Sequence, residues 1–491
     1  MQNSQRRYDI IKKVSKSERK RKIDVSKDEI KKAILKLKNG KTADEYGIRA
    51  EHIKHTGDEA LIAYQTIFKQ ILEEGKVAKS FKTGVITPVL KKGKNAMYTE
   101  NYRGITVTSI HGKVFEYVLI EKAKIRKMNQ SNMQFGFTEG LSPNMASLIL
   151  SEVCSEITGK NKLLFITTLD SQKAFDVVNH QILLDKMYFL GMDIQFWDII
   201  EDLYEDITST VKWQGDQSFS FRIEQGVRQG GVLSTHLYKQ YINELLCNLE
   251  KHGIGISIGN ITQDALHVLT ISSYSHMIIQ KCKKCWTPCI HIISAGDHRF
   301  QIHPVKSNTI IKNITKQKSE NFNNNLDSLK LGQNDIDINS ETTHLGLKRT
   351  TSDDSKINVD ERITLARRTL YSLIKSGVHG TNGLNPRTSV KIYQIYVIPR
   401  LLYGLETIHI QNKDMVSLCS FHLSTLKHLQ SLPNRTATSA VYLLVGALPI
   451  AAEIHKRQLS LLHSIAMSDN MSIREIARRQ HISGKPTSFL C

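Results

Sequence analysis

Long hydrophobic runs and a dense set of cysteines are both missing from this sequence. No uninterrupted apolar stretch approaches the roughly 20 residues that a membrane-spanning helix needs. Residues 1–22 are polar and basic, which argues against a secretory signal. Seven cysteines in 491 residues, without an apolar leader, favour a reducing compartment. We therefore expect a soluble intracellular protein, located in the nucleus and/or the cytoplasm, with no membrane contact.

Negative charge is also scarce relative to positive charge. The chain has 67 Lys and Arg residues against 47 Asp and Glu residues, which gives a net charge of +20. Such a chain attracts polyanions, of which nucleic acid is the commonest, although ribosomal, membrane-surface and heparin-binding proteins share this balance. Residues 1–25 are expected to form a basic disordered arm. Its densest run, residues 19–22, suits nuclear import, RNA contact or a merely solvated tail.

The sequence shows no internal repeat and no long low-complexity linker, and its helix signals are distinct. Ser26 and Glu29 have the spacing of a capping box, which predicts a helix that Gly40 ends. A second amphipathic helix is predicted from Asp58 to Glu74, with Gly75 closing it. From about residue 359 to about residue 466 the pattern is mostly helical.

Two strands are predicted among these helices. Residues 85–90 read as a strand, and Pro88 within them indicates an edge or a bulge. Residues 163–169 are apolar and β-branched throughout, which predicts a buried strand ending at Asp170. A buried carboxylate is costly unless a partner such as a divalent metal ion holds it, although an Asp that caps a turn is the plainer reading. Interleaved helices and strands followed by a helical end predict an α+β fold.

Two sequence strings place Asp170 in a wider pattern. FITTLDSQKAFDVVNH occupies residues 165–180, and GVRQGGVLS begins at residue 226. In this order and spacing they resemble the first two palm motifs of the reverse transcriptases of non-LTR (LINE-type) retrotransposons. Eight further strings follow the same family order: LKNGKTADEYGI, TPVLKKGK, NYRGITVTSIHGKVFE, QFGFTEG, IHPVKS, THLGL, YVIPRLLYGLE and GALPIAAEIHKRQLSLL. The similarity covers about residues 26–467.

The resemblance implies a right-hand polymerase fold, with fingers, a palm built on a small antiparallel sheet with helices, and a helical thumb. We expect fingers over residues 26–160, a palm over residues 161–350 that includes part of the fingers, a helical thumb or connection over residues 351–470, and a tail over residues 471–491. Relatives usually carry an endonuclease before or after the polymerase. The flanks here are too short for one, so we expect a fragment of an element or a lost endonuclease.

The implied activity is that of an RNA-directed DNA polymerase, a nucleotidyltransferase acting on an RNA template, a DNA primer and deoxynucleoside triphosphates. Such enzymes use two Mg²⁺ ions held by converging carboxylates to stabilise the attacking and leaving oxygens. In this family the carboxylates are the motif A aspartate, matched by Asp170, and an aspartate pair in a hairpin after motif B. Lys306 matches the motif D lysine, which lies near the leaving pyrophosphate and suits a general acid.

Five further residues match positions that contact the incoming nucleotide. Lys91, for which Lys92 is a rival, and Arg103 match the residues that grip the triphosphate, where an ammonium and a forked guanidinium suit phosphate oxygens. Phe175 matches the aromatic gate that excludes a 2′-hydroxyl, and plain core packing is a compatible role. Gln229 matches a motif B position that contacts the nucleotide, and Gly230 belongs to a glycine pair that lets the backbone approach template and nucleotide.

The sequence departs from the family at motif C, where an aromatic or small residue, Ala-Asp-Asp and an apolar strand are expected. The best superposition places Asp264 on the first aspartate and Ala265 on the second, so the metal ligands predicted are Asp170 and Asp264. Asp353 and Asp354 are adjacent but lie after the other palm motifs, in a polar stretch, and are rejected as motif C. The missing carboxylate weakens the expected metal site.

Two further patterns are judged by their spacing and by their position in the chain. The residues from His344 to Leu347 resemble the primer grip. Four residues suggest zinc ligands, but their spacing is too tight for a usual knuckle, and a polar helix face is the favoured reading: Cys282, Cys285, Cys289 and His291. A non-catalytic nucleic-acid-binding remnant of such an enzyme is the alternative function.

Overall fold

The computed structural model of the protein describes most of the chain, namely residues 23–159, 163–171, 173–251, 268–271, 275–280, 307–313, 329–331, 334–380 and 382–483. These form two compact units, each built from discontinuous segments. Unit 1 combines Met1–Ser131, Gln172–Cys247 and Ala295–Gln301, whereas unit 2 combines Asn132–Ser171, Asn248–Ser294 and Ile302–Cys491.

Unit 1 begins with helices whose ends follow local rules. Helix α2 (Lys27–Leu35) has the predicted capping box between Ser26 and Glu29, and α4 (Asp58–Glu74) ends at Gly75 in the left-handed conformation. Both predicted helices are confirmed. The remaining helices of unit 1 are α3 (Ala50–Lys54), α5 (Lys79–Lys82), α6 (Ile110–Lys122), α8 (His180–Phe189), α9 (Ile194–Tyr204) and most of α10 (Leu233–Lys251).

A five-stranded sheet completes unit 1. Its main path is β2 (Tyr102–Thr108), β1 (Thr83–Leu90), β4 (Thr208–Trp213) and β5 (Asp216–Gln217), and β6 (Phe221–Arg222) also pairs with β4. Strand β1 confirms the strand predicted over residues 85–90. It pairs with β4 only from Thr83 to Ile86, so Pro88 lies beyond that pairing and has one strand neighbour, β2, where it is opposite Gly104.

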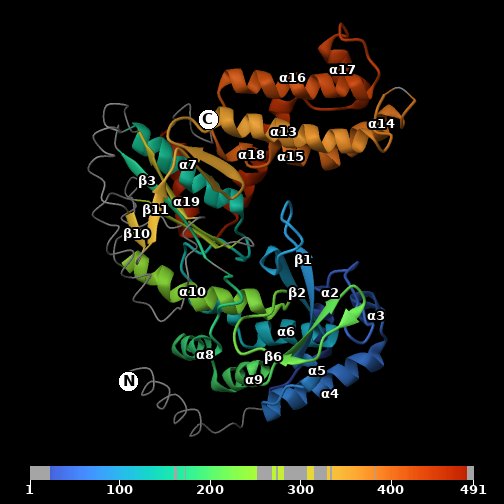
Figure 1. The fold of residues 1–491 in the computed structure, drawn as a ribbon, viewed down its shortest axis with the longest axis vertical. Helices are drawn as coiled ribbons and strands as arrows, with labels where there is room; N and C mark the ends of the chain where they lie inside the picture. Colours follow the sequence, from blue (N-terminus) through green and yellow to red (C-terminus); the bar gives the residue numbers. More distant parts are fainter. Residues whose placement is uncertain are drawn as a thin grey trace. The chain divides into compact units, whose positions relative to one another are not determined.

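Unit 2 is centred on a six-stranded sheet in the order β10-β11-β9-β3-β8-β7. Strand β3 (Leu164–Asp170) is buried along its whole length between two antiparallel neighbours, which confirms the predicted buried strand. The other strands are β7 (Val268–Ile271), β8 (Ser275–Gln280), β9 (Asn308–Lys312), β10 (Leu329–Leu331) and β11 (Asn334–Ile338). Side chains of α7 (Pro143–Gly159), α18 (Ile450–Ala466) and α19 (Met471–Ser483) pack with β3 and β9 in one apolar cluster. Figure 1 shows α7 and α19 beside this sheet.

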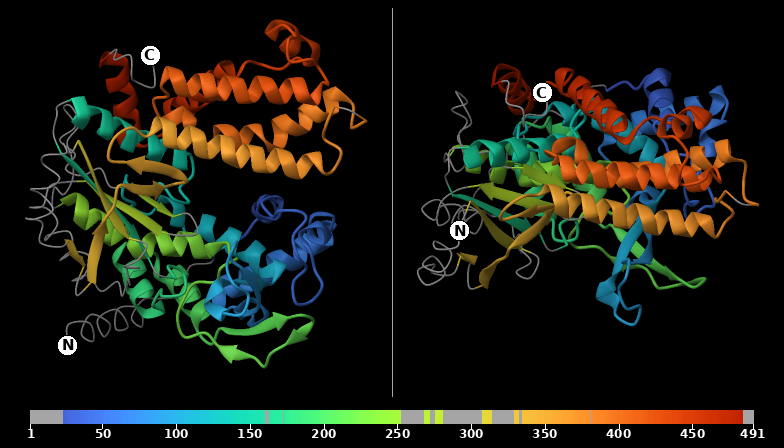
Figure 2. Two further views of the ribbon diagram at one scale, coloured as in Figure 1. Left: turned by 45° about the horizontal axis from the view of Figure 1, so that its top comes forward. Right: turned by 90° about the horizontal axis from the view of Figure 1, so that it is seen from above.

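The helical end of unit 2 confirms the helices predicted after residue 359. It contains α13 (Ser355–Ile374), α14 (Pro386–Tyr396), α15 (Ile398–Leu402), α16 (Asn412–Leu429) and α17 (Thr438–Val445), together with α18. Their buried side chains form one apolar cluster, and α13 runs beside α16 in both views of Figure 2. The expected tail begins with α19, whose Ile473 and Ile476 are buried.

Taken together, the helices and sheets of the two units confirm the predicted α+β class. Within the described part of the chain, no single helix has the length and apolar character to cross a membrane. Helices α17 and α18 meet that test only as a pair, with a bend of 55° between them.

Candidate functional site

Asp170 lies at the C-terminal end of β3 in unit 2, as the sequence predicts for the motif A aspartate. Its side chain is 1% exposed, and its backbone N–H donates to Oγ of Ser307 at 3.0 Å. On one side the register pairs Asp170 with His276 of β8, and on the other it pairs Thr168 with Asn308 of β9. The backbone of Asp170 is therefore paired with β8 on one side, and on the other side it is held by the Ser307 side chain, beyond the last β3–β9 pair.

The described residues around Asp170 do not form a donor set for two divalent ions. Hard cations of this kind need several oxygen ligands, and carboxylates are the strongest of these. Neither β8 (SHMIIQ) nor β9 (NTIIK) contains an Asp or a Glu. Among the described residues, no group of three or more His, Cys, Asp and Glu side chains is placed to hold a metal ion. Asp264 and Lys306, the other predicted catalytic residues, lie outside the described residues.

In unit 1, the loop after motif A and the loop of motif B are joined by hydrogen bonds. The N–H of Gly226 donates to the carbonyl of Val178 at 2.7 Å, and the N–H of Val227 donates to the carbonyl of Phe175 at 2.8 Å. Nε2 of His180 donates to the carbonyl of Gly226 at 2.7 Å. Burial lowers the pKa of His180, which keeps the ring neutral, and the bond to Gly226 only partly offsets this. The two motifs thus form one rigid surface.

The motif B glycines are required by this packing. Gly226 has φ +94°, and a Cβ there would lie 3.0 Å from the carbonyl oxygen of Asp176. Gly230 has φ +139°, and a Cβ there would lie 2.2 Å from the carbonyl oxygen of Thr106. Both contacts are with this chain's own backbone. The close approach that the glycines allow therefore lets the motif loops pack against each other and against β2.

Gln229 connects the motif loops to β2 and to a carboxylate. Its side-chain N–H donates to Oδ1 of Asp176 at 3.0 Å, and its carbonyl accepts the N–H of Thr106 at 2.8 Å. Loss of surrounding water raises the pKa of Asp176, although its side chain keeps an exposed edge, and Gln229, Lys173 and Lys91 oppose that rise. Lys91, one of the two candidate triphosphate lysines, thus acts on the same carboxylate as Gln229.

Phe175, Lys91 and Arg103 also belong to this unit. The Phe175 ring packs on Tyr238 of α10 with ring centres 5.0 Å apart, and it stays partly exposed. Arg103 is on β2 opposite Val89, and Lys91 follows the end of β1. Nζ of Lys91 donates to the carbonyl of Glu100 at 2.7 Å, which holds the lysine across the β1–β2 connection. All five predicted nucleotide-binding residues, including Gly230, therefore lie in unit 1.

Sequence reasoning missed a buried ion pair that supports motif B. Arg228 and Glu116 are 6% and 4% exposed, and their side chains approach to 3.4 Å. Oε2 of Glu116 accepts the N–H groups of Val232 and Leu233, so the carboxylate caps the N-terminus of α10. Arg228 Nη1 donates to the carbonyl of Phe81. Two features of the sequence could have indicated this ion pair: a Glu within the apolar sequence of α6 and an Arg inside motif B.

The predicted primer-grip residues form a tight hairpin turn in unit 2. Strands β12 (Glu341–His344) and β13 (Leu347–Thr350) are joined by Leu345 and Gly346, with φ +53° and +77°. Positive φ at both central residues is typical of a type I′ turn. Tyr403 donates to the carbonyl of Leu345 at 3.1 Å, and Arg362 donates to that of Gly346. The turn is therefore held by Arg362 of α13 and by Tyr403, which follows α15, while the side chain of His344 is fully buried.

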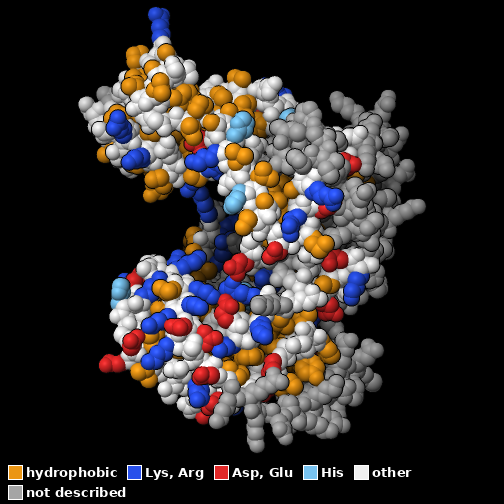
Figure 3. Space-filling view, turned by 180° about the vertical axis from the view of Figure 1, so that it is seen from behind, with side chains coloured by type: hydrophobic (Ala, Val, Ile, Leu, Met, Phe, Trp, Pro, Cys, Tyr) orange, Lys and Arg blue, Asp and Glu red, His pale blue; other side chains and the backbone are white. Residues whose placement is uncertain are grey.

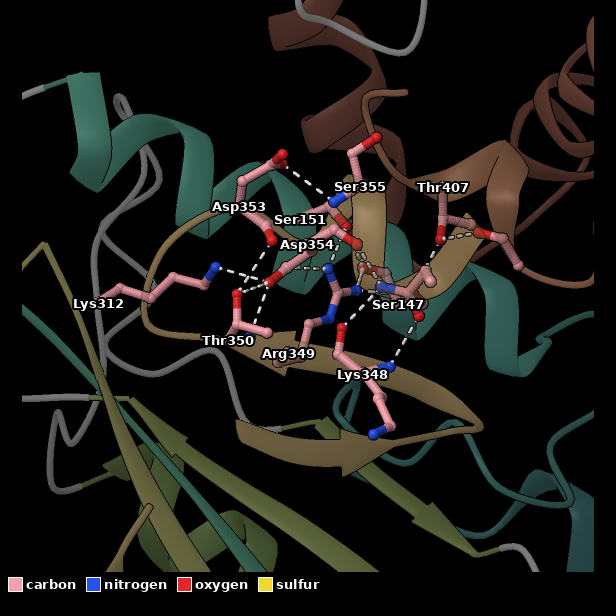
Figure 4. A network of polar contacts seen from close by, with 12 residues as sticks. Ser147, Ser151, Lys312, Lys348, Arg349, Thr350, Asp353, Asp354, Ser355 and Thr407 are labelled. Atoms are coloured by element: carbon pink, nitrogen blue, oxygen red, sulfur yellow. Dashed lines mark hydrogen bonds and ion pairs between the residues drawn. The ribbon is translucent and has the colours of Figure 1, made fainter. Parts of the chain in front are cut away.

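The Asp353–Asp354 pair, rejected as motif C, belongs to a structural network (Figure 4). Oδ2 of Asp354 lies 3.2 Å from Nη1 of Arg349, and Oδ1 lies 3.0 Å from Nζ of Lys312. Arg349, 1% exposed, also donates to the carbonyl and hydroxyl of Ser147 on α7. Burial alone would raise the pKa of Asp354, but Arg349 and Lys312 outweigh it, so the pKa is lowered. This carboxylate joins β9, β13 and α7 and is not available to a metal ion.

The tight Cys and His cluster predicted as an unlikely zinc site, formed by Cys282, Cys285, Cys289 and His291, lies outside the described residues. In unit 1, the described arrangement offers cationic side chains, an aromatic ring and an amide on one framework. Those groups suit a phosphate, a sugar and a base edge respectively. In unit 2, the described residues place the buried carboxylate of Asp170 at the end of β3.

Comparison with known proteins gives consistent results. Residues 89–272 match the family model for "Reverse transcriptase (RNA-dependent DNA polymerase)". The chain is 25% identical over 427 residues to the RNA-directed DNA polymerase from mobile element jockey of Drosophila funebris, covering 85% of this chain and 44% of that protein. It is 28% identical over 180 residues to the Pol polyprotein of retrotransposable element R2 of Popillia japonica, covering 36% of this chain and 25% of that protein. The chain thus spans less than half the length of these relatives.

Among solved structures, telomerase from Candida tropicalis in complex with a fragment of telomeric RNA is 14% identical to this chain. The match covers 85% of this chain and 67% of that one, with a TM-score of 0.39. With its motifs in family order and a reverse transcriptase match over residues 89–272, the chain is similar to the reverse transcriptases of the retrotransposable elements jockey and R2.

Proposed function

We propose that the chain is the polymerase core of a retrotransposon reverse transcriptase, an RNA-directed DNA polymerase whose catalytic power is reduced. The observation that carries this is the hydrogen-bonded junction of β2 with the loops of motifs A and B. Thr106, Asp176 and Gln229 meet there. This junction holds the proposed nucleotide-binding residues of unit 1 in fixed positions. A protein that binds nucleic acid only through its positive charge does not need such fixed positions.

Each proposed role follows from the chemistry of its side chain. Lys91 and Arg103 bind the triphosphate, since both carry a charge opposite to that of the phosphates. Phe175 lies under the sugar and excludes a 2′-hydroxyl. Gln229 and Gly230 line the base and backbone side of the nucleotide. The proposed substrates are an RNA template, a DNA primer and deoxynucleoside triphosphates.

Reverse transcriptases use divalent metal ions, and Mg²⁺ is the ion that we propose for this chain. Asp170, with Asp264 and Lys306, is the proposed catalytic set. Since the described residues bring a single carboxylate to the end of β3, we expect polymerisation to be weak or absent. The alternative is a non-catalytic nucleic-acid-binding protein located, like the polymerase, in the nucleus and/or the cytoplasm.

Binding of primer–template is tested by its dependence on salt. Lys and Arg side chains are spread over the face of the molecule in Figure 3, and the net charge is +20. We expect affinity for a fluorescent RNA–DNA primer–template to fall by about a thousandfold between 50 and 200 mM salt, as when many phosphates are neutralised. Deleting residues 1–22 should weaken binding and flatten this slope. A nearly constant affinity across that range contradicts the proposal.

Nucleotide binding is tested at Arg103. Arg103→Ala should raise the Kd for a deoxynucleoside triphosphate more than the Kd for primer–template, because the guanidinium contacts the triphosphate and not the duplex. Arg222→Ala is the matched control. Arg222 lies in the same sheet, is exposed and pairs with Asp206. Equal effects of the two substitutions on nucleotide binding would remove Arg103 from the site.

Primer extension separates the polymerase from the non-catalytic alternative. We expect weak extension by the unmodified chain, and none by Asp170→Asn. Absence of extension by the unmodified chain, with duplex and nucleotide binding intact, favours the alternative. Strong extension that Asp170→Asn abolishes would show that the carboxylate set is complete.

A further inference from the structure

The motif B turn that carries Gln229 is buried at both ends and more exposed in the middle. The N–H of Gly231 donates to the carbonyl of Arg228 at 3.1 Å, so Gln229 and Gly230 are the two central residues of a tight turn. On either side of it, Arg228 and Leu233 are 6% and 1% exposed, whereas Gly230 is exposed and Gln229 is partly exposed. The position of the Gln229 side chain therefore depends on what holds the two buried ends.

One buried carboxylate, that of Glu116 on α6, holds both ends of this turn. Its Oε1 lies 3.4 Å from Nη2 of Arg228, at the first end. Its Oε2 accepts the N–H groups of Val232 and Leu233 at 2.6 and 2.9 Å, at the second end. All of these residues belong to unit 1. The two oxygens of a single side chain therefore connect the two ends of the turn to α6.

The same carboxylate occupies the place at which an anion would otherwise bind. A glycine-rich loop followed by a helix N-terminus commonly binds phosphate, because N–H groups point outward there and the helix dipole is positive. At the start of α10, the N–H groups of Val232 and Leu233 donate to Glu116 instead. The motif B loop is therefore closed to a triphosphate, and it offers the nucleotide only the turn at Gln229 and Gly230.

The charge of Glu116 matters as well as its shape. Arg228 is buried, and its Nη1 donates to the carbonyl of Phe81 at 2.8 Å. Burial lowers the pKa of Lys113, one turn earlier on α6, and the charge of Glu116 opposes this lowering. Two cationic side chains therefore face this carboxylate. An uncharged replacement removes the group with which the buried guanidinium of Arg228 is paired.

We propose that Glu116 is a positioning residue of the nucleotide site, which sets the place of Gln229 and Gly230 by holding both ends of the motif B turn. This inference rests on the proposed function and deepens it. Glu116 acts through the turn and does not touch the nucleotide. Its loss therefore weakens nucleotide binding far more than primer–template binding, which is spread over many charges.

The test separates the position of Gln229 from the stability of the fold. Glu116→Gln keeps the side-chain length and one acceptor oxygen but removes the charge that pairs with Arg228. Asp354→Asn is the matched control in unit 2, because Asp354 is also a mostly buried acid that pairs with an Arg and accepts a backbone N–H, that of Thr350 at 2.8 Å. For each full-length protein, two Kd values are measured: that of a fluorescent deoxynucleoside triphosphate at saturating primer–template, and that of primer–template. Thermal melting measures stability.

Glu116→Gln should raise the nucleotide Kd by about tenfold, as for a loss of about 1.4 kcal/mol of binding free energy, and the primer–template Kd by less than about twofold. Asp354→Asn should lower the melting temperature and leave the nucleotide Kd unchanged. Adding Glu116→Gln to Gln229→Ala should raise the nucleotide Kd by less than about twofold, because both changes act on one side chain. Arg228→Lys should give a smaller rise than Glu116→Gln, which keeps the test open if that variant does not fold.

A lower melting temperature of Glu116→Gln with an unchanged nucleotide Kd would leave the carboxylate a structural role alone and overturn the inference. Nucleotide and primer–template Kd values that rise together would also overturn it, as would a rise with Asp354→Asn equal to that with Glu116→Gln. Absence of nucleotide binding by the unmodified chain is a separate outcome, since it contradicts the proposed function and removes the inference with it.

Discussion

The side-chain amide of Gln229 donates a hydrogen bond to Oδ1 of Asp176 at 3.0 Å, and this contact joins motif B to the loop after motif A. Neither residue is adjacent to the other in sequence, and the contact depends on Gly226 and Gly230 adopting positive φ. The same amide opposes the rise in the pKa of Asp176 that loss of water causes. The pair therefore couples the packing of the two motif loops to the charge of Asp176.

The first prediction concerns this pair. Gln229→Ala removes the donor that favours the carboxylate, so the pKa of Asp176 should rise further above its usual value. A carboxyl group whose pKa is raised on folding contributes stability below its unfolded pKa, and this contribution is lost as the pH rises through the folded pKa. The Asp176 carboxyl therefore contributes none at pH 7, so Asp176→Asn should not destabilise the protein at that pH. Carbon-13 NMR of the carboxyl groups measures the titration. Gln217→Ala, which removes an exposed bond to Thr210, should leave Asp176 unchanged.

The second prediction tests the sugar gate without requiring catalysis. Phe175→Ala should reduce the preference for deoxynucleotides over ribonucleotides by about tenfold, as expected for loss of about 1.4 kcal/mol of discrimination. Competition binding of the two triphosphates measures it. Phe189→Ala, at a ring that is 60% exposed on α8, serves as the control. An unchanged preference in the Phe175 variant would leave that ring with only its packing on Tyr238.

The third prediction separates two adjacent acids. Asp354→Asn leaves Arg349 and Lys312 buried without their counter-charge, so it should cost about 3 to 5 kcal/mol of unfolding free energy. Asp353→Asn keeps an acceptor for the N–H of Ser355 at the start of α13 and should cost at most about 1 kcal/mol. Urea denaturation measures both. Similar losses in the two variants would show that the buried network does not anchor β13.

The Asp354 network also has a pH dependence with a definite sign. The pKa of Asp354 is lowered in the folded protein, so its stabilising contribution is present above the unfolded pKa of about 3.9 and is lost as pH falls through the folded pKa. The Asp354→Asn variant should therefore lose less stability than the unmodified chain on acidification.

The fourth prediction separates backbone strain from steric conflict. Gly230 and Gly215 both have positive φ, at +139° and +102°, but a Cβ meets the Thr106 carbonyl only at Gly230. Gly215→Ala bears backbone strain alone, of about 1 to 3 kcal/mol. Gly230→Ala should cost more and should also weaken nucleotide binding, because it displaces Gln229 from Thr106. Equal losses of stability in the two variants would mean that β2 moves away from the added Cβ without a further loss of unfolding free energy.

The family and many local elements could be predicted from the sequence because their causes are local. A capping box fixed the start of α2, Gly75 fixed the end of α4, and an unbroken apolar run identified β3. The motif order gave the candidate nucleotide residues, and the structure places Lys91, Arg103, Phe175, Gln229 and Gly230 in one unit. Their roles in binding stay predictions.

Tertiary structure decided what depends on pairing between distant segments. The sequence could not show that β8 lies beside β3 with His276 opposite Asp170, because strand register is set by long-range ladders and a shift of one residue reverses every side chain. Nor could it assign Glu116 to the N-terminus of α10 or Asp354 to Arg349, since a charge is recognised as structural only when its buried partner is known. The sequence by itself determined the kind of protein and its local elements, and the fold decided which charges meet.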